Sequence, residues 1–91
     1  MLAIKIKMMP GCDQSYRLSE IDEIYLNGCS QDGYYKKAVV HDYVKNNPGS
    51  IQVSISPYPN LVPAVSTTGE KYVRSQSNDS TQDNLLSLPR E

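Results

Sequence analysis

The sequence contains no tryptophan and no phenylalanine, and it has only one histidine and two cysteines in 91 residues. Its large aromatic side chains are therefore the 7 tyrosines, whose hydroxyl groups all need water or a hydrogen-bond partner. Positive charges (9 Lys and Arg) nearly balance negative ones (10 Asp and Glu), for a net charge of -1. This balance argues against a general attraction to nucleic acid or to anionic membranes.

Long apolar runs are also missing, because no segment approaches the roughly 20 apolar residues of a membrane-spanning helix. The opening MLAIKIKMM is interrupted by Lys5 and Lys7, and no small-residue cleavage site follows it, so we expect no signal peptide. A chain of this length supports one hydrophobic core, so we expect residues 1–91 to form a single domain. These features predict a cytoplasmic protein.

The few cysteines and the single histidine do not form a metal-binding pattern. Cys12 and Cys29 are predicted to be free thiols, since small disulfide-stabilised domains usually carry more cysteines. A zinc site would need these two residues and His41, with Asp13 or Asp32 in support, but their spacing matches no zinc motif. We expect neither a metal nor a cofactor.

Catalytic motifs are absent as well: the sequence has no GxSxG, no HExxH and no glycine-rich phosphate-binding loop. His41 stands beside Asp42 on the helix face that we expect to be exposed, where a solvated imidazole is more common than a general base. We therefore expect no catalytic residues and no enzymatic activity.

Hydrophobic alternation predicts a hairpin of two strands at the start of the chain. In LAIKIKMM every second residue is strongly apolar, and SEIDEIYLNG is a second β-prone run that ends in Asn-Gly. The expected core pairs are Ile6 with Ile24 and Ile4 with Leu26, and the expected pairs on the opposite face are Lys7 with Glu23 and Lys5 with Tyr25. Opposite charges across two strands are a favourable match.

The stretch CSQDGYYKKAVVHDYVKNNPG predicts the helix of this domain, with Ser30 or Asp32 as N-cap and NNPG as the stop. At about 100° per residue, one apolar stripe is expected to face the core. Its residues are Val39, Val40, Tyr43 and Val44. The residues expected to face solvent are His41, Asp42 and Lys45.

Three short runs after the helix read as strands: SIQVSIS, LVPAVS and EKYVRS. Pro63 lies inside the second run and points to an edge strand or a bulge. The order ββαβββ predicts an α+β fold, with a small, mostly antiparallel sheet of about five strands, one packed helix and a C-terminal helical turn.

The terminal DNLLSLP is unusually apolar for a chain end, so we expect it to close the core as a clasp. Asp83 is expected to cap a helical turn, and Leu85 and Leu88, which share a face, are expected to enter the core. Arg74 is expected to donate a charge-assisted hydrogen bond to Asp83. The predicted clasp residues are Arg74, Asp83, Asn84, Leu85 and Leu88. The alternative is that this stretch is a docking peptide for a partner.

The stretches KYVRS and DNLLSLP resemble the ending of a family of short bacterial proteins that is classed only as a domain of unknown function. Members of that family carry a Y-x-R-T stretch followed by DNLL-x-LP. The matching residues here are Tyr72, Arg74, Asp83, Asn84, Leu85, Leu86, Leu88 and Pro89, and Ser75 stands where the family usually has threonine. The resemblance implies two strands, a helix and further strands, but no function, because the family has no assigned activity.

Two binding functions fit this composition, and the favoured one is a protein or peptide interaction module. An exposed edge is expected at SPYPNLVPAVS, with a candidate binding surface at Tyr58, Leu61 and Tyr72, although the prolines equally fit protection of an edge against aggregation. The alternative is a weak single-stranded nucleic-acid-binding module. Its residues would be Lys5, Lys7, Arg17, Lys36, Lys37, Tyr16, Tyr34 and Tyr35, close to the opposing charges of Glu20, Asp22 and Glu23.

Overall fold

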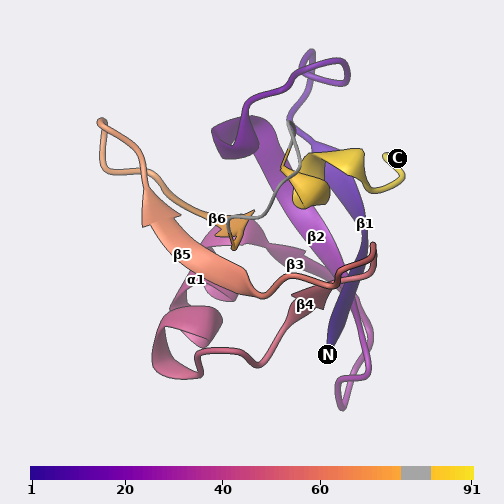
Figure 1. Ribbon diagram of the computed structural model, residues 1–91. Helices are drawn as coiled ribbons and strands as arrows, with labels where there is room; N and C mark the ends of the chain where they lie inside the picture. The colour runs from indigo at the N-terminus through magenta and orange to yellow at the C-terminus, as the bar shows by residue number, and fades with distance from the viewer. Residues whose placement is uncertain (77–82) are drawn as a thin grey trace.

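The computed structural model describes residues 1–76 and 83–91, which form six strands, one α-helix and two short 3₁₀ helices (Figure 1). In chain order these are β1 (Leu2–Met8), η1 (Leu18–Glu20), β2 (Ile21–Asn27), β3 (Gly33–Lys36), α1 (Lys37–Asn46), β4 (Gln52–Val53), β5 (Leu61–Val65), β6 (Lys71–Ser75) and η2 (Asn84–Ser87). The predicted α+β class and the C-terminal helical turn are confirmed.

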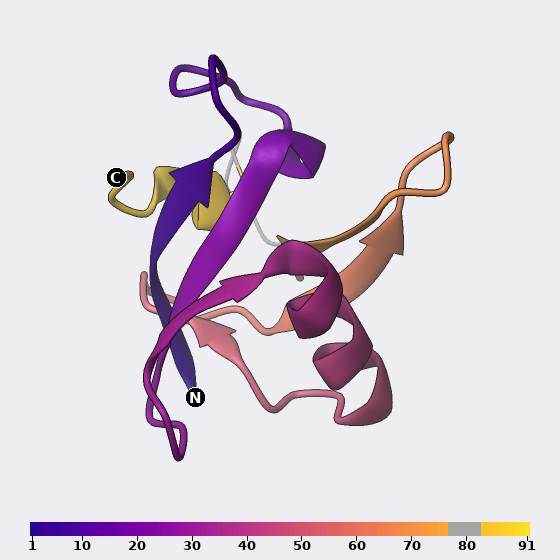
Figure 2. The same ribbon diagram turned by 180° about the vertical axis from the view of Figure 1, so that it is seen from behind.

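The strands form two sheets rather than the single sheet that was predicted. Four strands lie in the order β3-β2-β1-β4, in which β1 pairs antiparallel with β2 but parallel with β4. The other two, β5 and β6, form a separate antiparallel pair that packs against α1 (Figure 2). The helix therefore lies beside both sheets.

The predicted hairpin of β1 and β2 is confirmed, with one error of register. Lys5 faces Tyr25, Ile6 faces Ile24 and Lys7 faces Glu23, as expected. However, the register shifts between Ala3 and Lys5, so Ala3 and not Ile4 stands opposite Leu26. An irregularity of this kind changes which residues point to the core, because side chains alternate along a strand. Ala3 is consequently buried and Leu2 is exposed.

The helix begins later than predicted, and neither Ser30 nor Asp32 is its N-cap. Residues Gly33–Lys36 form β3, which pairs with β2. The helix α1 starts directly after β3, with Lys36 at the N-cap position. Two adjacent tyrosines favour a strand, which explains this difference from the predicted helix. The Asp32 carboxylate instead accepts hydrogen bonds from the backbone N–H groups of Gly28 and Cys29, at 3.0 Å each.

The buried face of α1 also differs from the predicted one. Val40 and Val44 are buried as expected, but so is His41, which is only 4% exposed. Val39 and Tyr43 were predicted to enter the core, yet they are 55% and 42% exposed. The physical reason is that β5 and β6 pack against α1, where Lys71 of β6 reaches Asp42, the neighbour of His41. Asp42 and Lys45 face solvent as expected.

The hydrophobic core joins both sheets, the helix and the C-terminal turn. Its buried members are Ala3, Ile6, Met8, Ile21, Ile24, Leu26, Val40, Val44, Ile51, Val53, Leu61, Val73, Leu85, Leu86 and Leu88. The C-terminal residues thus complete a core that begins with β1.

Asp83 caps the C-terminal turn as the sequence predicts. Its carboxylate accepts hydrogen bonds from the backbone N–H of Leu85 at 2.9 Å and from that of Ser75 at 3.0 Å. The prediction of a hydrogen bond between Arg74 and Asp83 is wrong. Arg74 donates to the carbonyl oxygen of Ser75, and it makes no ion pair with Asp83 among the described residues. The backbone of β6, rather than the Arg74 side chain, fixes the position of Asp83.

Candidate functional site

An open, mainly apolar groove lies between β3, the loop that follows β2, and α1. We call it the β3–α1 groove; its volume is about 380 Å³, and residues that line it include Met1, Cys29, Tyr35, Val39, Val40 and Tyr43. The exposed side chains of Val39 and Tyr43 belong to it, so the helix residues that were wrongly predicted to be in the core form part of a surface groove. Concave apolar sites of this size are common binding sites.

The strand beside this groove, β3, lies at the edge of the four-stranded sheet. It pairs with β2 on one side, and no other described strand pairs with it on the other (Figure 2). An unpaired edge presents backbone N–H and C=O groups to which an extended segment can bind. The free edge and the apolar groove share Tyr35, which is a residue of β3 and lines the groove.

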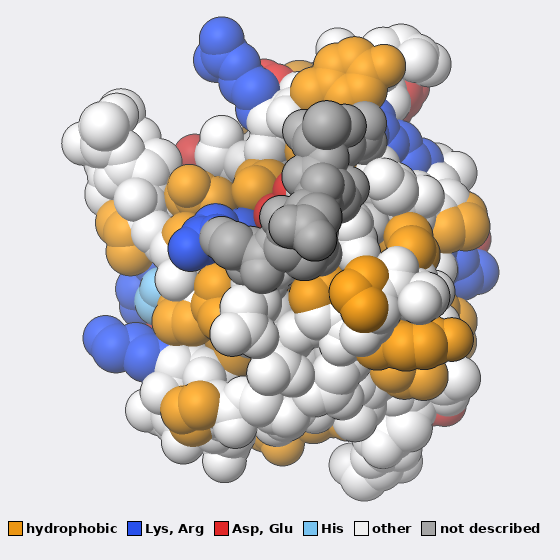
Figure 3. Space-filling model, in the orientation of Figure 1, with side chains coloured by type: hydrophobic (Ala, Val, Ile, Leu, Met, Phe, Trp, Pro, Cys, Tyr) orange, Lys and Arg blue, Asp and Glu red, His pale blue; other side chains and the backbone are white. Residues whose placement is uncertain are grey.

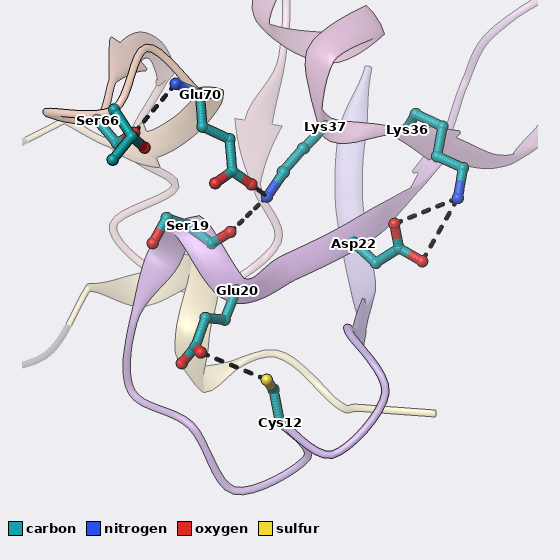
Figure 4. A network of polar contacts seen from close by, with 9 residues as sticks. Cys12, Ser19, Glu20, Asp22, Lys36, Lys37, Ser66 and Glu70 are labelled. Atoms are coloured by element: carbon teal, nitrogen blue, oxygen red, sulfur yellow. Dashed lines mark hydrogen bonds and ion pairs between the residues drawn. The ribbon is translucent and has the colours of Figure 1, made fainter.

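The two thiols are free, as predicted, and lie in different surroundings. Cys29 lines the β3–α1 groove. The Cys12 thiol donates to Glu20 Oε2 at 3.4 Å (Figure 4). This hydrogen bond, together with burial and the negative charge of Glu20, raises the pKa of Cys12. Conversely, hydrogen bonds from Ser15 and Cys12 lower the pKa of Glu20.

We predict that Glu20→Gln increases the rate at which Cys12 reacts with a maleimide, relative to Cys29 in the same molecule. Loss of the Glu20 charge lowers the pKa of Cys12 and raises its thiolate fraction, and the thiolate is the reactive form. Peptide mass spectrometry of protein labelled for short times at neutral pH measures the ratio of the two rates. Glu23→Gln is the matched control. An unchanged ratio in Glu20→Gln would refute the influence of Glu20 on the Cys12 thiol.

Charged side chains connect α1 to the β5–β6 pair. The Lys37 ammonium, on a side chain that is 10% exposed, donates to the carboxylate of Glu70 and to the carbonyl oxygen of Ser19 (Figure 4). Asp42 accepts from Lys71 at 3.1 Å and lies 2.9 Å from His41 Nδ1. The hydrogen bond with His41, followed by that from Lys71, lowers the pKa of Asp42. These contacts hold β5 and β6 on the helix.

The face of the four-stranded sheet that carries Lys5, Lys7, Tyr25 and Tyr34 gathers part of the predicted nucleic-acid set, and we call it the outer face. The Lys5 ammonium lies 5.0 Å from the ring centroid of Tyr25, and that of Lys7 lies 5.7 Å from Tyr34. The two rings meet edge to face at 5.1 Å. Amines and rings therefore contact each other within the protein.

Other residues of the predicted nucleic-acid set lie away from the outer face or are already paired. Lys36 contacts Asp22 at 3.2 Å and Glu23 at 3.6 Å, and its hydrogen bond with Asp22 is the main cause of its raised pKa. Lys37 is buried, and Tyr35 lines the β3–α1 groove. Tyr16 lies near Arg90, with the guanidinium 6.0 Å from its ring centroid.

The predicted binding surface of Tyr58, Leu61 and Tyr72 is interrupted, because Leu61 is buried. Leu61 is only 1% exposed, because its backbone N–H bonds to the carbonyl of Ile51 and draws the start of β5 into the core. Tyr58 is exposed in the turn before β5, whereas Tyr72 lies in β6 opposite Ala64. On the molecular face shown in Figure 3, hydrophobic side chains form separate patches between polar ones.

The described residues were compared with the requirements of a metal site and of a membrane-spanning helix. Within residues 1–76 and 83–91, no three His, Cys, Asp or Glu side chains lie close enough together to hold a metal ion. None of the helices in these two ranges has the length and apolar character needed to cross a membrane.

Comparisons with known proteins support the expected membership in a family of unknown function. No curated protein and no solved structure matches this chain. Residues 4–89 match the family described as "Protein of unknown function (DUF3892)". Because this match covers almost the whole sequence, the chain belongs to that family of unknown function.

Proposed function

We propose that this protein is a non-enzymatic interaction module that binds an extended segment of a partner protein along β3 and in the β3–α1 groove. The observation that carries this proposal is the free edge of β3 directly beside an exposed apolar groove. Backbone hydrogen bonds to an edge strand provide affinity, and a pocket for alternate side chains provides specificity.

The bound segment would continue the sheet beyond β3. Its side chains would point alternately to the two faces of the sheet, because successive residues of a strand do so. Those on the side of Tyr35 would meet the groove and its exposed residues Val39 and Tyr43. Since β3 has only four residues, few backbone bonds are available, and an apolar side chain in the groove would supply much of the affinity.

The surroundings of the titratable groups support a role without catalysis. His41 is buried at the interface between α1 and the β5–β6 pair, and its Nδ1 is held by Asp42. Glu20 raises the pKa of Cys12, which opposes formation of a nucleophilic thiolate.

The free thiols also support a reducing compartment such as the cytoplasm, and the resemblance in the C-terminal residues supports a bacterial source.

Selection of random linear peptides on the immobilised protein tests this function. We predict that selected peptides bind Val39→Asp at least about tenfold more weakly than wild type, because a carboxylate in the apolar groove must be desolvated by the bound side chain. Val65→Asp is the matched control, since Val65 is 58% exposed, like Val39 at 55%, but lies at the end of β5. It should leave peptide affinity unchanged.

A second measurement links binding to the groove itself. Cys29 lines the groove and Cys12 does not, so a bound peptide should slow maleimide labelling of Cys29 more than that of Cys12. Failure to select any peptide, or equal loss of affinity in Val39→Asp and Val65→Asp, would refute the proposed site.

A second candidate function is weak binding of single-stranded nucleic acid on the outer face. The observation that favours it is the gathering of Lys5 and Lys7 over Tyr25 and Tyr34. Binding through phosphates should weaken steeply with added salt, because each contact releases counterions. A short oligothymidylate that fails to bind at low salt would remove this candidate.

A further inference from the structure

Residues 89–91 lie beside β1 and place a carboxylate on the outer face. The backbone N–H of Ile6 donates to the carbonyl of Pro89 at 2.9 Å, and the N–H of Glu91 donates to the carbonyl of Ile6 at 3.1 Å. The Glu91 carboxylate accepts a hydrogen bond from Lys5 Nζ at 3.0 Å. This contact joins two residues that are 86 positions apart in the sequence.

Neighbouring contacts keep this segment in position without using the Glu91 side chain. Arg90 donates to the carbonyl oxygens of Asp13 and Ser15, both at 2.8 Å, and to that of Leu86 at 3.1 Å. The backbone of Glu91 is held by Ile6. The carboxylate is therefore a separable part of the contact, which can leave Lys5 while the backbone stays in place.

The outer face has more hydrogen-bonding capacity for an anion than Glu91 uses. The Tyr34 hydroxyl is buried and lies beside the Glu91 carboxylate. Lys7 forms no ion pair with any other described residue. Burial, followed by a hydrogen bond with the Glu91 carboxylate, raises the pKa of Tyr34 to about 12, so this hydroxyl stays protonated and able to donate to a carboxylate.

We infer that the outer face is a carboxylate-binding site, that Glu91 occupies it within the chain, and that an acidic segment of a partner protein competes with Glu91 for it. When Glu91 leaves, Lys5 loses its ion pair, and Glu23, the carboxylate opposite Lys7 in β2, already lies 3.6 Å from Lys36 Nζ. The local charge is then positive, and two ammonium groups and a phenol are suitable donors for carboxylate oxygens.

The observations favour an acidic peptide over a nucleic acid at this site. Single-stranded nucleic acids rely on aromatic faces that are open for stacking by bases. Here the two rings contact each other edge to face, and each has a lysine ammonium near its ring. The occupant that the structure shows is a carboxylate.

The test is the binding of a fluorescent hexaglutamate peptide to the full chain at low salt, with hexaglutamine as the neutral control. Glu91→Gln should bind hexaglutamate about two- to fivefold more tightly than wild type, the factor expected for release of one exposed ion pair. Adding Lys7→Gln to Glu91→Gln should cancel this gain. Adding Lys45→Gln instead should not, because Lys45 is exposed on α1, away from the outer face.

Each other result would overturn the inference. Equal binding of hexaglutamate and hexaglutamine, no gain in Glu91→Gln, or equal effects of Lys7→Gln and Lys45→Gln would show that no carboxylate site exists on this face. Tighter binding of a short oligothymidylate than of hexaglutamate would assign the face to nucleic acid instead. Unfolding midpoints measured for every variant identify any loss that comes from instability.

Discussion

A chain that ends at Gln82 is expected to lose its cooperative unfolding transition, because residues 83–91 supply Leu85, Leu86 and Leu88 to the core. All three side chains are buried, and Asp83 ties their turn to the backbone of β6. Truncation of one buried leucine to alanine costs about 2 to 5 kcal/mol. A domain of this length has a total stability of about 5 to 14 kcal/mol, so the loss of three leucines removes most or all of it.

Single substitutions separate this role from general effects at a chain end. Leu85→Ala should lower the denaturant midpoint clearly, whereas Ser87→Ala, at an exposed position of the same turn, should change the free energy of unfolding by less than about 0.5 kcal/mol. Circular dichroism during urea unfolding measures both. A truncated chain that unfolds with the full wild-type transition would mean that the tail is a free docking peptide.

Glu70→Ala is expected to destabilise the protein by about 1 to 3 kcal/mol, and more than Lys37→Met does. Without Glu70, the buried Lys37 ammonium keeps the carbonyl of Ser19 as its one hydrogen-bond partner among residues 1–76 and 83–91. An incompletely paired buried charge is costly, whereas an apolar residue of similar volume at the same position is often tolerated. Substitution of Glu70, the more exposed partner, should therefore destabilise the protein more than substitution of Lys37.

The ion pair between Lys71 and Asp42 connects the same elements and serves as the control. Both of its side chains are about half exposed, so Lys71→Met should cost no more than about 1 kcal/mol. Urea unfolding of the three variants gives their order directly. Equal destabilisation by Glu70→Ala and Lys71→Met would show that burial of Lys37 has no energetic consequence.

The first hairpin was predictable from the sequence because two local signals agree. Apolar alternation determines which residues face the core, and the charges of Lys7 and Glu23 favour the observed pairing. The position of Ile4 was not predictable in the same way. The register shift between Ala3 and Lys5 changes the pattern within β1, and the sequence has no glycine or proline there that would reveal it.

The errors in α1 come from tertiary packing. Periodicity indicates which residues share a helix face, but it does not indicate which neighbour covers the rest of the helix. Here β5 and β6 cover His41, while Val39 and Tyr43 stay exposed beside β3. The β3–α1 groove was missed because two of its exposed residues, Val39 and Tyr43, were assigned to the core. The adjacent tyrosines of GYYK were the available signal for an extra strand.

The C-terminal turn shows the same division between local and distant interactions. The Asp83 cap and the buried leucines follow from residues two to five positions apart, which sequence patterns describe well. Contacts of Arg90 with Ser15 and of Glu91 with Lys5 join residues 75 and 86 positions apart, and no local pattern predicts them. The outer-face site therefore became visible only in the folded chain.

The most direct test of the proposed function is backbone amide hydrogen exchange, measured by NMR with and without a selected peptide. The account predicts that binding slows exchange at amides of Gly33–Lys36 that point away from β2, and that chemical shifts change around Val39 and Tyr43. Changes confined to β5 and β6, or to the outer face with β3 unaffected, would contradict binding at the β3 edge.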